Sequence, residues 1–153
     1  KKAPVLESII GTSFAGWKKY YEALVIGALP KTGEISIPLP ARMGGGKVPA
    51  LSKFRVLAQL PGMTHIEVEI SSGRHHQIRR HFAMIGHPLI CDDVYGIAKE
   101  NRKFSRNFKL RDFFLHASKL VFLHPDTGKI IEVTDPLPPA FSVVLKKLRS
   151  PKQ

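Results

Sequence analysis

The chain has 153 residues, 43% of them hydrophobic and 24% charged, which is an ordinary globular composition and excludes a wholly disordered tail. Its longest apolar runs fall far short of the roughly 20 residues that a membrane span requires, so no membrane association is expected. Lys and Arg number 24 against 12 Asp and Glu, and the net charge of +12 favours a polyanionic partner, above all RNA.

Strand patterns dominate the first part of the chain. Lys18–Gly27 is rich in Tyr, Leu, Val and Ile and is largely apolar on both faces, so a central strand is expected there. A turn at Leu29–Gly33 and a short strand at Glu34–Leu39 follow. The three consecutive glycines of Ala41–Pro49 predict a flexible basic loop, without the spacing of a phosphate-binding P-loop. Phe54–Leu60 is the next predicted strand.

The segment Thr64–Ile70 alternates between apolar and polar residues. This period of two predicts a half-buried antiparallel strand with one face toward the core. The expected inward residues are Ile66, Val68 and Ile70, and the expected outward residues are His65, Glu67 and Glu69.

A helix is predicted for His75–Ile85. Ile78, Phe82 and Ile85 fall on one stripe at 100° per residue and are expected to face the core. Gly86 stands where a left-handed C-terminal cap belongs, so the helix is expected to end there.

The strongly basic segment Ala98–Asp112 is predicted to be a surface loop. One interpretation is a solvated loop. The other is an RNA-contacting loop in which Lys and Arg meet phosphates and Phe104 or Phe108 stacks on a base.

The last part of the chain predicts a hairpin and a helix. Strands at Leu120–Leu123 and Ile130–Thr134 are joined by the turn sequence HPDTG, and Phe141–Leu148 has a helical apolar side. Together these elements predict one domain of the α+β class, with a mixed, largely antiparallel sheet and a few packed helices.

The densest group of polar residues is GRHHQIRRH, at residues 73–81, where a strand is expected to lead into a helix. Free amides at a helix N-terminus favour anions. On a helical wheel Arg79 borders the core stripe, so it is expected to have an internal partner. Arg80 lies a further 100° round and is expected to face solvent or a phosphate.

Metal and nucleophile chemistry are not expected. The spacing of His75, His76, His81 and Cys91 matches no metal-binding pattern. A single cysteine without a local signature is expected to be a small buried side chain, and it fits a reducing intracellular compartment, either the cytoplasm or a mitochondrial or other organelle matrix.

Residues 73–96, GRHHQIRRHFAMIGHPLICDDVYG, resemble the signature GRxHQIRxHxxxxGHPIxGDxxYG of RluA-type RNA pseudouridine synthases. Three further segments match that family in the same order. Residues 19–27 resemble its KxYxALVxG strand, residues 33–39 its GxIxxPL segment, and residues 115–128 its LHAxxLxFxHPxTG segment. The resemblance runs from about Trp17 to Leu148 and implies the pseudouridine synthase fold.

The chain departs from the family pattern at several positions. His75 replaces a small or hydroxylated residue, Arg80 an apolar one and Cys91 a glycine. The HRLDxxTSG segment, which supplies the family's catalytic aspartate, is absent, since residues 1–16 contain no Asp. Residues 1–153 are therefore expected to be the C-terminal part of a catalytic domain. Asp92 and Asp93 match a later segment and are not assigned that catalytic role.

The resemblance implies isomerisation of uridine to pseudouridine in ribosomal or transfer RNA, without metal or other cofactor. By the same resemblance, the catalytic residues are Tyr21 and Arg79: Arg79 pairs with the catalytic aspartate, while Tyr21 packs on the target uracil and helps to remove the proton from C5. The residues expected to shape the pocket or contact RNA are Lys19, Arg74, His75, His76, Gln77, Arg80, Arg102, Lys103 and Arg106. The alternatives are a catalytically inactive RNA-binding protein, for example one associated with ribosomal particles or their assembly, and a basic structural protein.

Overall fold

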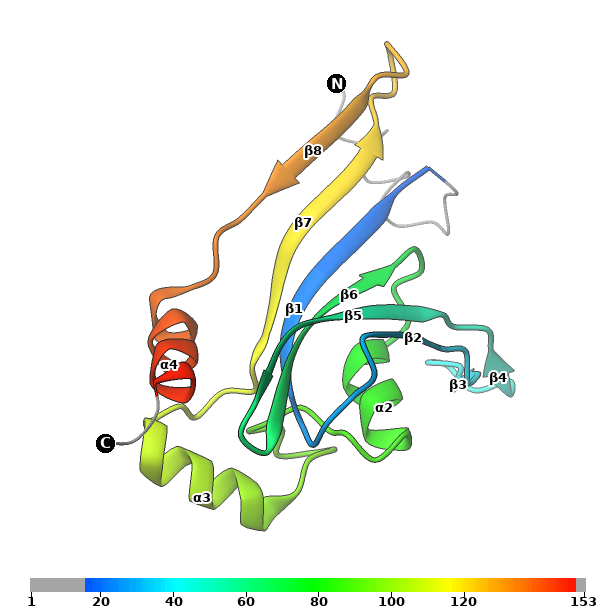
Figure 1. The fold of residues 1–153 in the computed structure, drawn as a ribbon. Coiled ribbons are helices and arrows are strands. Elements are labelled where there is room, and N and C mark those ends of the chain that lie inside the picture. Colours follow the sequence, from blue (N-terminus) through cyan, green and yellow to red (C-terminus); the bar gives the residue numbers. More distant parts are fainter. Residues whose placement is uncertain (1–15, 151–153) are drawn as a thin grey trace.

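A computed structural model describes residues 16–150, in which six strands form one antiparallel sheet and three helices pack against it (Figure 1). The order across the sheet is β2-β5-β6-β1-β7-β8, and a separate two-stranded ribbon pairs β3 with β4. The strands are β1 Lys18–Ile26, β2 Thr32–Ile35, β3 Leu39–Pro40, β4 Lys47–Val48, β5 Ser52–Leu60, β6 Met63–Ile70, β7 Leu115–Leu123 and β8 Ile130–Thr134. The helices are α2 Gln77–Met84, α3 Ala98–Phe108 and α4 Pro139–Arg149.

Strand β1 lies in the middle of the sheet, as its sequence predicts. It pairs antiparallel with β6 on one side and with β7 on the other. Both of its faces are apolar because both are covered. Ala23 and Val25 face α2, whereas Leu24 faces the side where α3 and α4 pack.

Two hydrophobic cores therefore lie on opposite faces of the sheet. We call the one beneath α2, which includes Ile78 and Phe82, the first core. The second core contains Phe104 of α3 together with Val144 and Leu145 of α4. The terminal helix thus forms where the sequence places it, and its apolar side is buried.

The prediction of a surface loop at Ala98–Asp112 is wrong, because residues 98–108 form helix α3. Phe104 and Phe108 are four residues apart, which places them on one helix face. Their rings lie 4.6 Å apart, and Phe104 is buried in the second core. The many charges around this pair are the solvent-facing side of an amphipathic helix.

Smaller corrections concern residue environments. His65 is buried rather than outward-facing, because the second core covers that face of β6 and Phe114 packs against its imidazole. Ile85 is 36% exposed, and the helix instead buries His81 completely. Strand β2 begins at Thr32, inside the predicted turn, and the glycine loop closes the β3–β4 ribbon. Strand β7 begins five residues before the predicted strand at Leu120.

No helix within residues 16–150 is long and apolar enough to cross a membrane.

Candidate active site

A pocket of about 400 Å³, lined by both polar and apolar side chains, lies where the segment after β6 leads into α2. Its walls come from the first part of β1, from the turn before α2, from α2 itself and from the segment leading into β7. The lining residues are Lys19, Tyr21, Ile70, Gly73, Arg74, His76, Gln77, Ile78, Arg79, Phe113 and Leu115. Six of the residues predicted from the sequence thus line one pocket.

The turn before α2 is fixed by Gln77. Its side-chain amide donates to the Leu51 carbonyl at 2.9 Å, and its Oε1 accepts the Arg74 amide at 3.2 Å. Arg74 Nε donates to the Pro49 carbonyl at 3.0 Å. Because Gln77 is almost fully buried and bonded at both ends, it shapes the pocket wall by holding this turn against the segment that leads into β5.

His76 begins α2 in the left-handed region, with φ 51°. Its ring stacks on His75 with centroids 3.7 Å apart, and its Nδ1 lies 3.0 Å from the Tyr95 hydroxyl. Burial, and then the nearby positive charge of Arg79, lower the pKa of His76. The imidazole is therefore neutral at pH 7 and can share one hydrogen bond with Tyr95.

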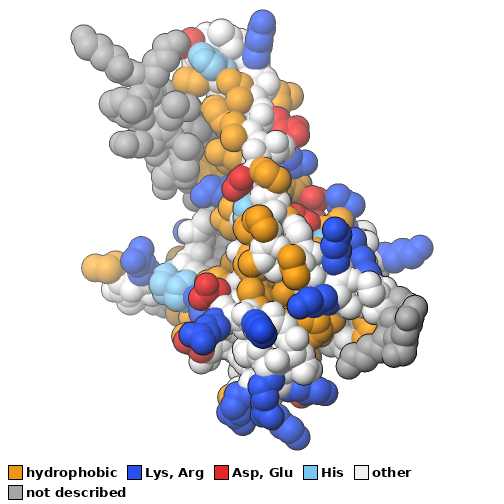
Figure 2. All heavy atoms as spheres, turned by 90° about the vertical axis from the view of Figure 1, so that its left-hand side faces the viewer, with side chains coloured by type: hydrophobic (Ala, Val, Ile, Leu, Met, Phe, Trp, Pro, Cys, Tyr) orange, Lys and Arg blue, Asp and Glu red, His pale blue; other side chains and the backbone are white. Residues whose placement is uncertain are grey.

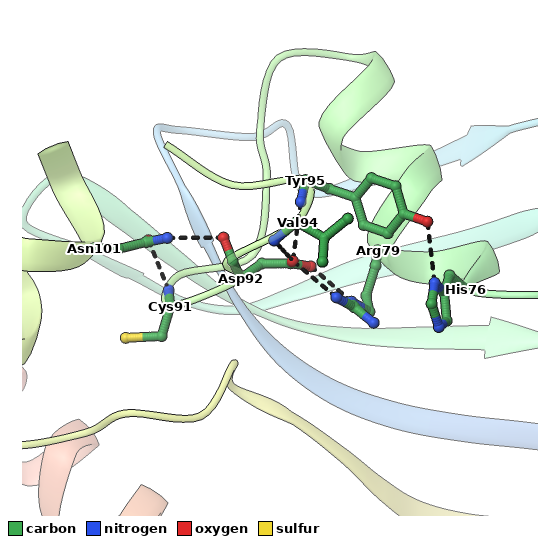
Figure 3. Close-up of polar contacts among 7 residues, drawn as sticks. All are labelled: His76, Arg79, Cys91, Asp92, Val94, Tyr95 and Asn101. Atoms are coloured by element: carbon green, nitrogen blue, oxygen red, sulfur yellow. Dashed lines mark hydrogen bonds and ion pairs between the residues drawn. The ribbon is translucent and has the colours of Figure 1, made fainter. Parts of the chain in front are cut away.

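Arg79 has the internal partner that its position on α2 predicts. Its Nε donates to Asp92 Oδ2 at 2.7 Å and its Nη2 donates to Oδ1 at 2.9 Å (Figure 3). Asp92 is fully buried, and burial alone would raise its pKa. The two bonds from Arg79 and the amides of Val94 and Tyr95 outweigh burial and lower that pKa, so the carboxylate is ionised.

Aromatic rings flank the Arg79 guanidinium. Its carbon lies 4.3 Å from the centre of the Phe113 ring and 5.1 Å from that of Tyr95. Cation–π attraction adds to the ion pair, and the two rings restrict how the guanidinium can turn.

Tyr21 extends from β1 into the pocket. It packs against the first core and is only partly buried. Burial raises the pKa of its phenol, which is therefore protonated at neutral pH. Among residues 16–150 its hydroxyl has no hydrogen-bond partner, so both the ring face and the hydroxyl are available to a ligand.

Of the other predicted residues, Lys19 lines the pocket and the rest do not. Lys19 places its Nζ 5.0 Å from the centre of the Trp17 ring. Arg80 does not line the pocket, and its guanidinium donates to the His75 carbonyl at 3.4 Å. The three predicted RNA contacts on α3 are exposed and do not line the pocket. They are Arg102, Lys103 and Arg106.

Lys103 lines a second, larger cavity of about 960 Å³, between α3, the end of α4 and the β5–β6 turn. Figure 2 shows the side of the molecule that carries α3, α4 and β8. A band of hydrophobic side chains runs down it, and Lys and Arg side chains gather at its lower end, where α3 lies.

Three residues of the site were not predicted: Asp92, Tyr95 and Phe113. Asp92 and Tyr95 lie inside the motif that resembles the family signature, which signalled their importance but not their partners. No sequence pattern around Phe113 predicts its place in the pocket, because the segment that leads into β7 brings it there. Within residues 16–150, no group of three or more His, Cys, Asp or Glu side chains could hold a metal ion.

A family profile and individual relatives both match this chain to RNA pseudouridine synthases. The family profile described as RNA pseudouridylate synthase matches residues 10–84. An RNA pseudouridine synthase of Chloroflexus aurantiacus is 36% identical, over 86% of this chain and 42% of its own length. Ribosomal large subunit pseudouridine synthase D of Pseudomonas aeruginosa is 35% identical, over 88% of this chain and 47% of its own. The chain therefore spans less than half the length of these relatives.

Solved structures agree on the fold. Human RNA pseudouridylate synthase domain containing 4 superposes with a TM-score of 0.78 at 19% identity, over 96% of this chain and 67% of that one. Human RNA pseudouridylate synthase domain containing 1 gives 0.71 at 20% identity, over 97% and 71%. The predicted α+β fold with its antiparallel sheet is confirmed.

Proposed function

The chain belongs to the RNA pseudouridine synthase family, and on that premise we propose that its pocket receives a uridine flipped out of RNA for isomerisation to pseudouridine. The observation that carries the proposal is one pocket lined by both Tyr21 and Arg79. An aromatic ring can stack on a flipped base, and a fixed guanidinium can donate hydrogen bonds to the anionic groups beside that base.

Different pocket residues are suited to the base and to the phosphates of the nucleotide. The Tyr21 ring offers a surface for stacking on the uracil, and its protonated hydroxyl can donate a hydrogen bond to the bound nucleotide. Lys19 and Arg74 line the same pocket and can meet the phosphates beside the flipped nucleotide.

Among residues 16–150, no Asp or Glu lines the pocket as a candidate for the reacting carboxylate. Both oxygens of Asp92 are engaged by Arg79, its side chain is fully buried, and it does not line the pocket. We therefore propose that residues 1–153 represent the C-terminal part of a catalytic domain and that the carboxylate lies on a segment outside them.

Ribosomal or transfer RNA is the proposed substrate, and ribosomal particles are the proposed partners. The net charge of +12 supports a polyanion, and relatives named for the large ribosomal subunit favour ribosomal RNA. A catalytically inactive RNA-binding protein is the second candidate, since no Asp or Glu is among the described residues that line the pocket.

Binding of a stem-loop RNA with one loop uridine tests the pocket, by fluorescence anisotropy. Replacing that uridine by an abasic nucleotide should weaken binding roughly 5- to 100-fold, since one stacked base contributes about 1–3 kcal/mol. Tyr21→Ala should abolish the difference between the two RNAs. Equal affinity of the unaltered protein for both RNAs would contradict the proposal.

Activity separates the two candidates. The 153-residue chain with bulk ribosomal RNA should produce no pseudouridine above a no-protein control, measured by mass spectrometry. The same measurement on a chain that also carries the family's aspartate segment should show conversion. Absence of conversion there would favour the inactive RNA-binding protein.

A further inference from the structure

We propose that Asp92 is the positioning residue for Arg79, and that it directs Nη1, the guanidinium nitrogen without a hydrogen bond among residues 16–150, at the ligand in the pocket. The inference rests on the proposed function, because it takes the pocket to be the nucleotide site. It assigns to Asp92 a role separate from that of the reacting carboxylate.

The geometry of the pair sets the direction. Two bonds, Nε to Oδ2 at 2.7 Å and Nη2 to Oδ1 at 2.9 Å, fix the plane and rotation of the guanidinium. Within residues 16–150, Nη1 of Arg79 makes no hydrogen bond. Arg79 lines the pocket and Asp92 does not, so the ion pair lies behind the pocket wall with Arg79 on the pocket side.

Asp92 is itself held in place. Its Oδ1 accepts the amides of Val94 and Tyr95, each at 3.0 Å, and its backbone carbonyl accepts Asn101 Nδ2 at 2.8 Å (Figure 3). Asn101 Oδ1 accepts the Cys91 amide at 2.8 Å. Asn101 belongs to α3, so the loop that carries Asp92 is tied to a helix outside the pocket.

The loop is also closed by a backbone hydrogen bond at Gly96. The Gly96 amide donates to the Asp92 carbonyl at 3.0 Å, and a Cβ at Gly96 would collide with that carbonyl oxygen. The Phe113 and Tyr95 rings lie close to the guanidinium and add to the restraint that Asp92 places on Arg79. Since Asp92 offsets its charge, Arg79 meets the ligand mainly as a directed donor, which suits a phosphate or carboxylate oxygen.

A purely structural role, in which Asp92 only caps its own turn, predicts lost stability and no specific change at Arg79. The test compares Asp92→Asn with Asp93→Asn, which removes the same charge from the exposed neighbouring side chain. Asp92→Glu is the second variant, because it keeps the charge while displacing the carboxylate. Circular dichroism establishes that each variant is folded.

The first measurement is hydrogen exchange at Arg79 Nε by ¹⁵N NMR. Exchange should be about ten- to hundredfold faster in Asp92→Asn, as expected for loss of a charged hydrogen bond, and unchanged in Asp93→Asn. The second is binding of uridine 5′-monophosphate. Asp92→Asn and Asp92→Glu should both weaken it about tenfold or more, and Asp93→Asn should not.

The outcomes separate the two proposals. A folded Asp92→Asn protein that binds the nucleotide normally, with unchanged exchange at Arg79 Nε, overturns the role of Asp92. If the unaltered protein does not bind the nucleotide, the proposed function fails at this pocket. In that case equal exchange in Asp92→Asn and Asp93→Asn would still overturn the positioning role, and faster exchange in Asp92→Asn alone would support it.

Discussion

Two adjacent arginines on α2 occupy opposite environments. Arg79 is buried and bonded to Asp92 through both carboxylate oxygens, whereas Arg80 is partly exposed and has one long bond to a carbonyl. Removing Arg79 would leave a fully buried carboxylate without its partner, which costs far more than removing a solvated charge.

Arg79→Ala is therefore expected to lower the free energy of unfolding by about 3–5 kcal/mol, and Arg80→Ala by less than about 0.5 kcal/mol. Arg79→Lys should recover little, because an ammonium cannot reproduce the two-pronged contact. Urea unfolding at pH 7 measures all three. Comparable losses for Arg79→Ala and Arg80→Ala would contradict the burial of this ion pair.

The strained backbone at Cys91 gives a second prediction. Its φ of 66° lies in the left-handed region, which costs a residue with a side chain roughly 1–2 kcal/mol relative to glycine. This is the position where the family pattern has glycine. The buried thiol offsets part of the strain by a weak hydrogen bond to the Leu110 carbonyl, at 3.5 Å.

Cys91→Ala should thus destabilise the protein, because it loses the sulfur and keeps the strain. Cys91→Gly should be at least as stable as Cys91→Ala although it removes more buried surface, since relief of the backbone compensates. Thermal unfolding of the two variants checks this. A Cys91→Gly protein less stable than Cys91→Ala by about 1 kcal/mol or more would show that the strain is unimportant.

At the scale of elements, His81 joins α2 to two other segments. Its Nε2 donates to the Ile37 carbonyl at 2.8 Å, and its Nδ1 lies 2.8 Å from the Ser52 hydroxyl, which can donate to it when the ring is neutral. Burial lowers the pKa of His81, and the bond to the carbonyl only partly opposes this. The folded protein therefore binds fewer protons than the unfolded chain below about pH 6.5.

Stability should accordingly be full above about pH 6.5 and decline as the pH falls through the lowered pKa of His81. His81→Gln should reduce the loss between pH 7 and pH 5, measured by urea unfolding, even if it lowers stability at pH 7. Buried His65, whose pKa burial also lowers, leaves some dependence in the variant. If the free energy of unfolding falls by the same amount between pH 7 and pH 5 in His81→Gln and in the unaltered protein, the role of His81 is contradicted.

The elements show what the sequence could and could not predict. Alternation and turn residues located β1, β5, β6 and β8, and the helical wheel separated Arg79 from Arg80, because these patterns are local. The outward prediction for His65 failed because helices from distant parts of the chain cover the second face of the sheet. Residues 98–108 were predicted to be a loop because of their high charge, although the four-residue spacing of Phe104 and Phe108 is helical.

The candidate site was predictable only in part, for the same reason. Tyr21, Arg74 and Arg79 followed from the family motif and lie at one pocket. The partnership of Arg79 with Asp92 joins residues 13 apart through a loop whose course depends on tertiary contacts. No periodicity encodes such a pair.

At the scale of the whole molecule, charge should govern RNA affinity. Each phosphate neutralised releases counterions, so the logarithm of the affinity falls linearly with the logarithm of salt concentration. Changing Arg102, Lys103 and Arg106 on α3 together to Gln should flatten that slope by roughly 2–3 units if all three meet phosphates.

The matched control changes Lys31, Lys53 and Arg55, exposed cations at the β2–β5 edge, two of which already pair with Glu34 and Glu67. This triple variant carries the same charge change and should leave the slope nearly unaltered. Anisotropy titrations between 50 and about 200 mM salt provide both slopes. A slope for the α3 variant equal to that of the unaltered protein would show that α3 makes no phosphate contacts.

The central claim is that the pocket beside Tyr21 and Arg79 receives a nucleotide withdrawn from RNA. Photocrosslinking with RNA that carries 4-thiouridine in place of uridine, followed by mass spectrometry of the crosslinked peptides, tests it most directly. The account predicts adducts on the pocket segments of β1 and α2, centred on Tyr21 and lost in Tyr21→Ala. Adducts confined to α3 and α4, on the opposite face of the sheet, would contradict it.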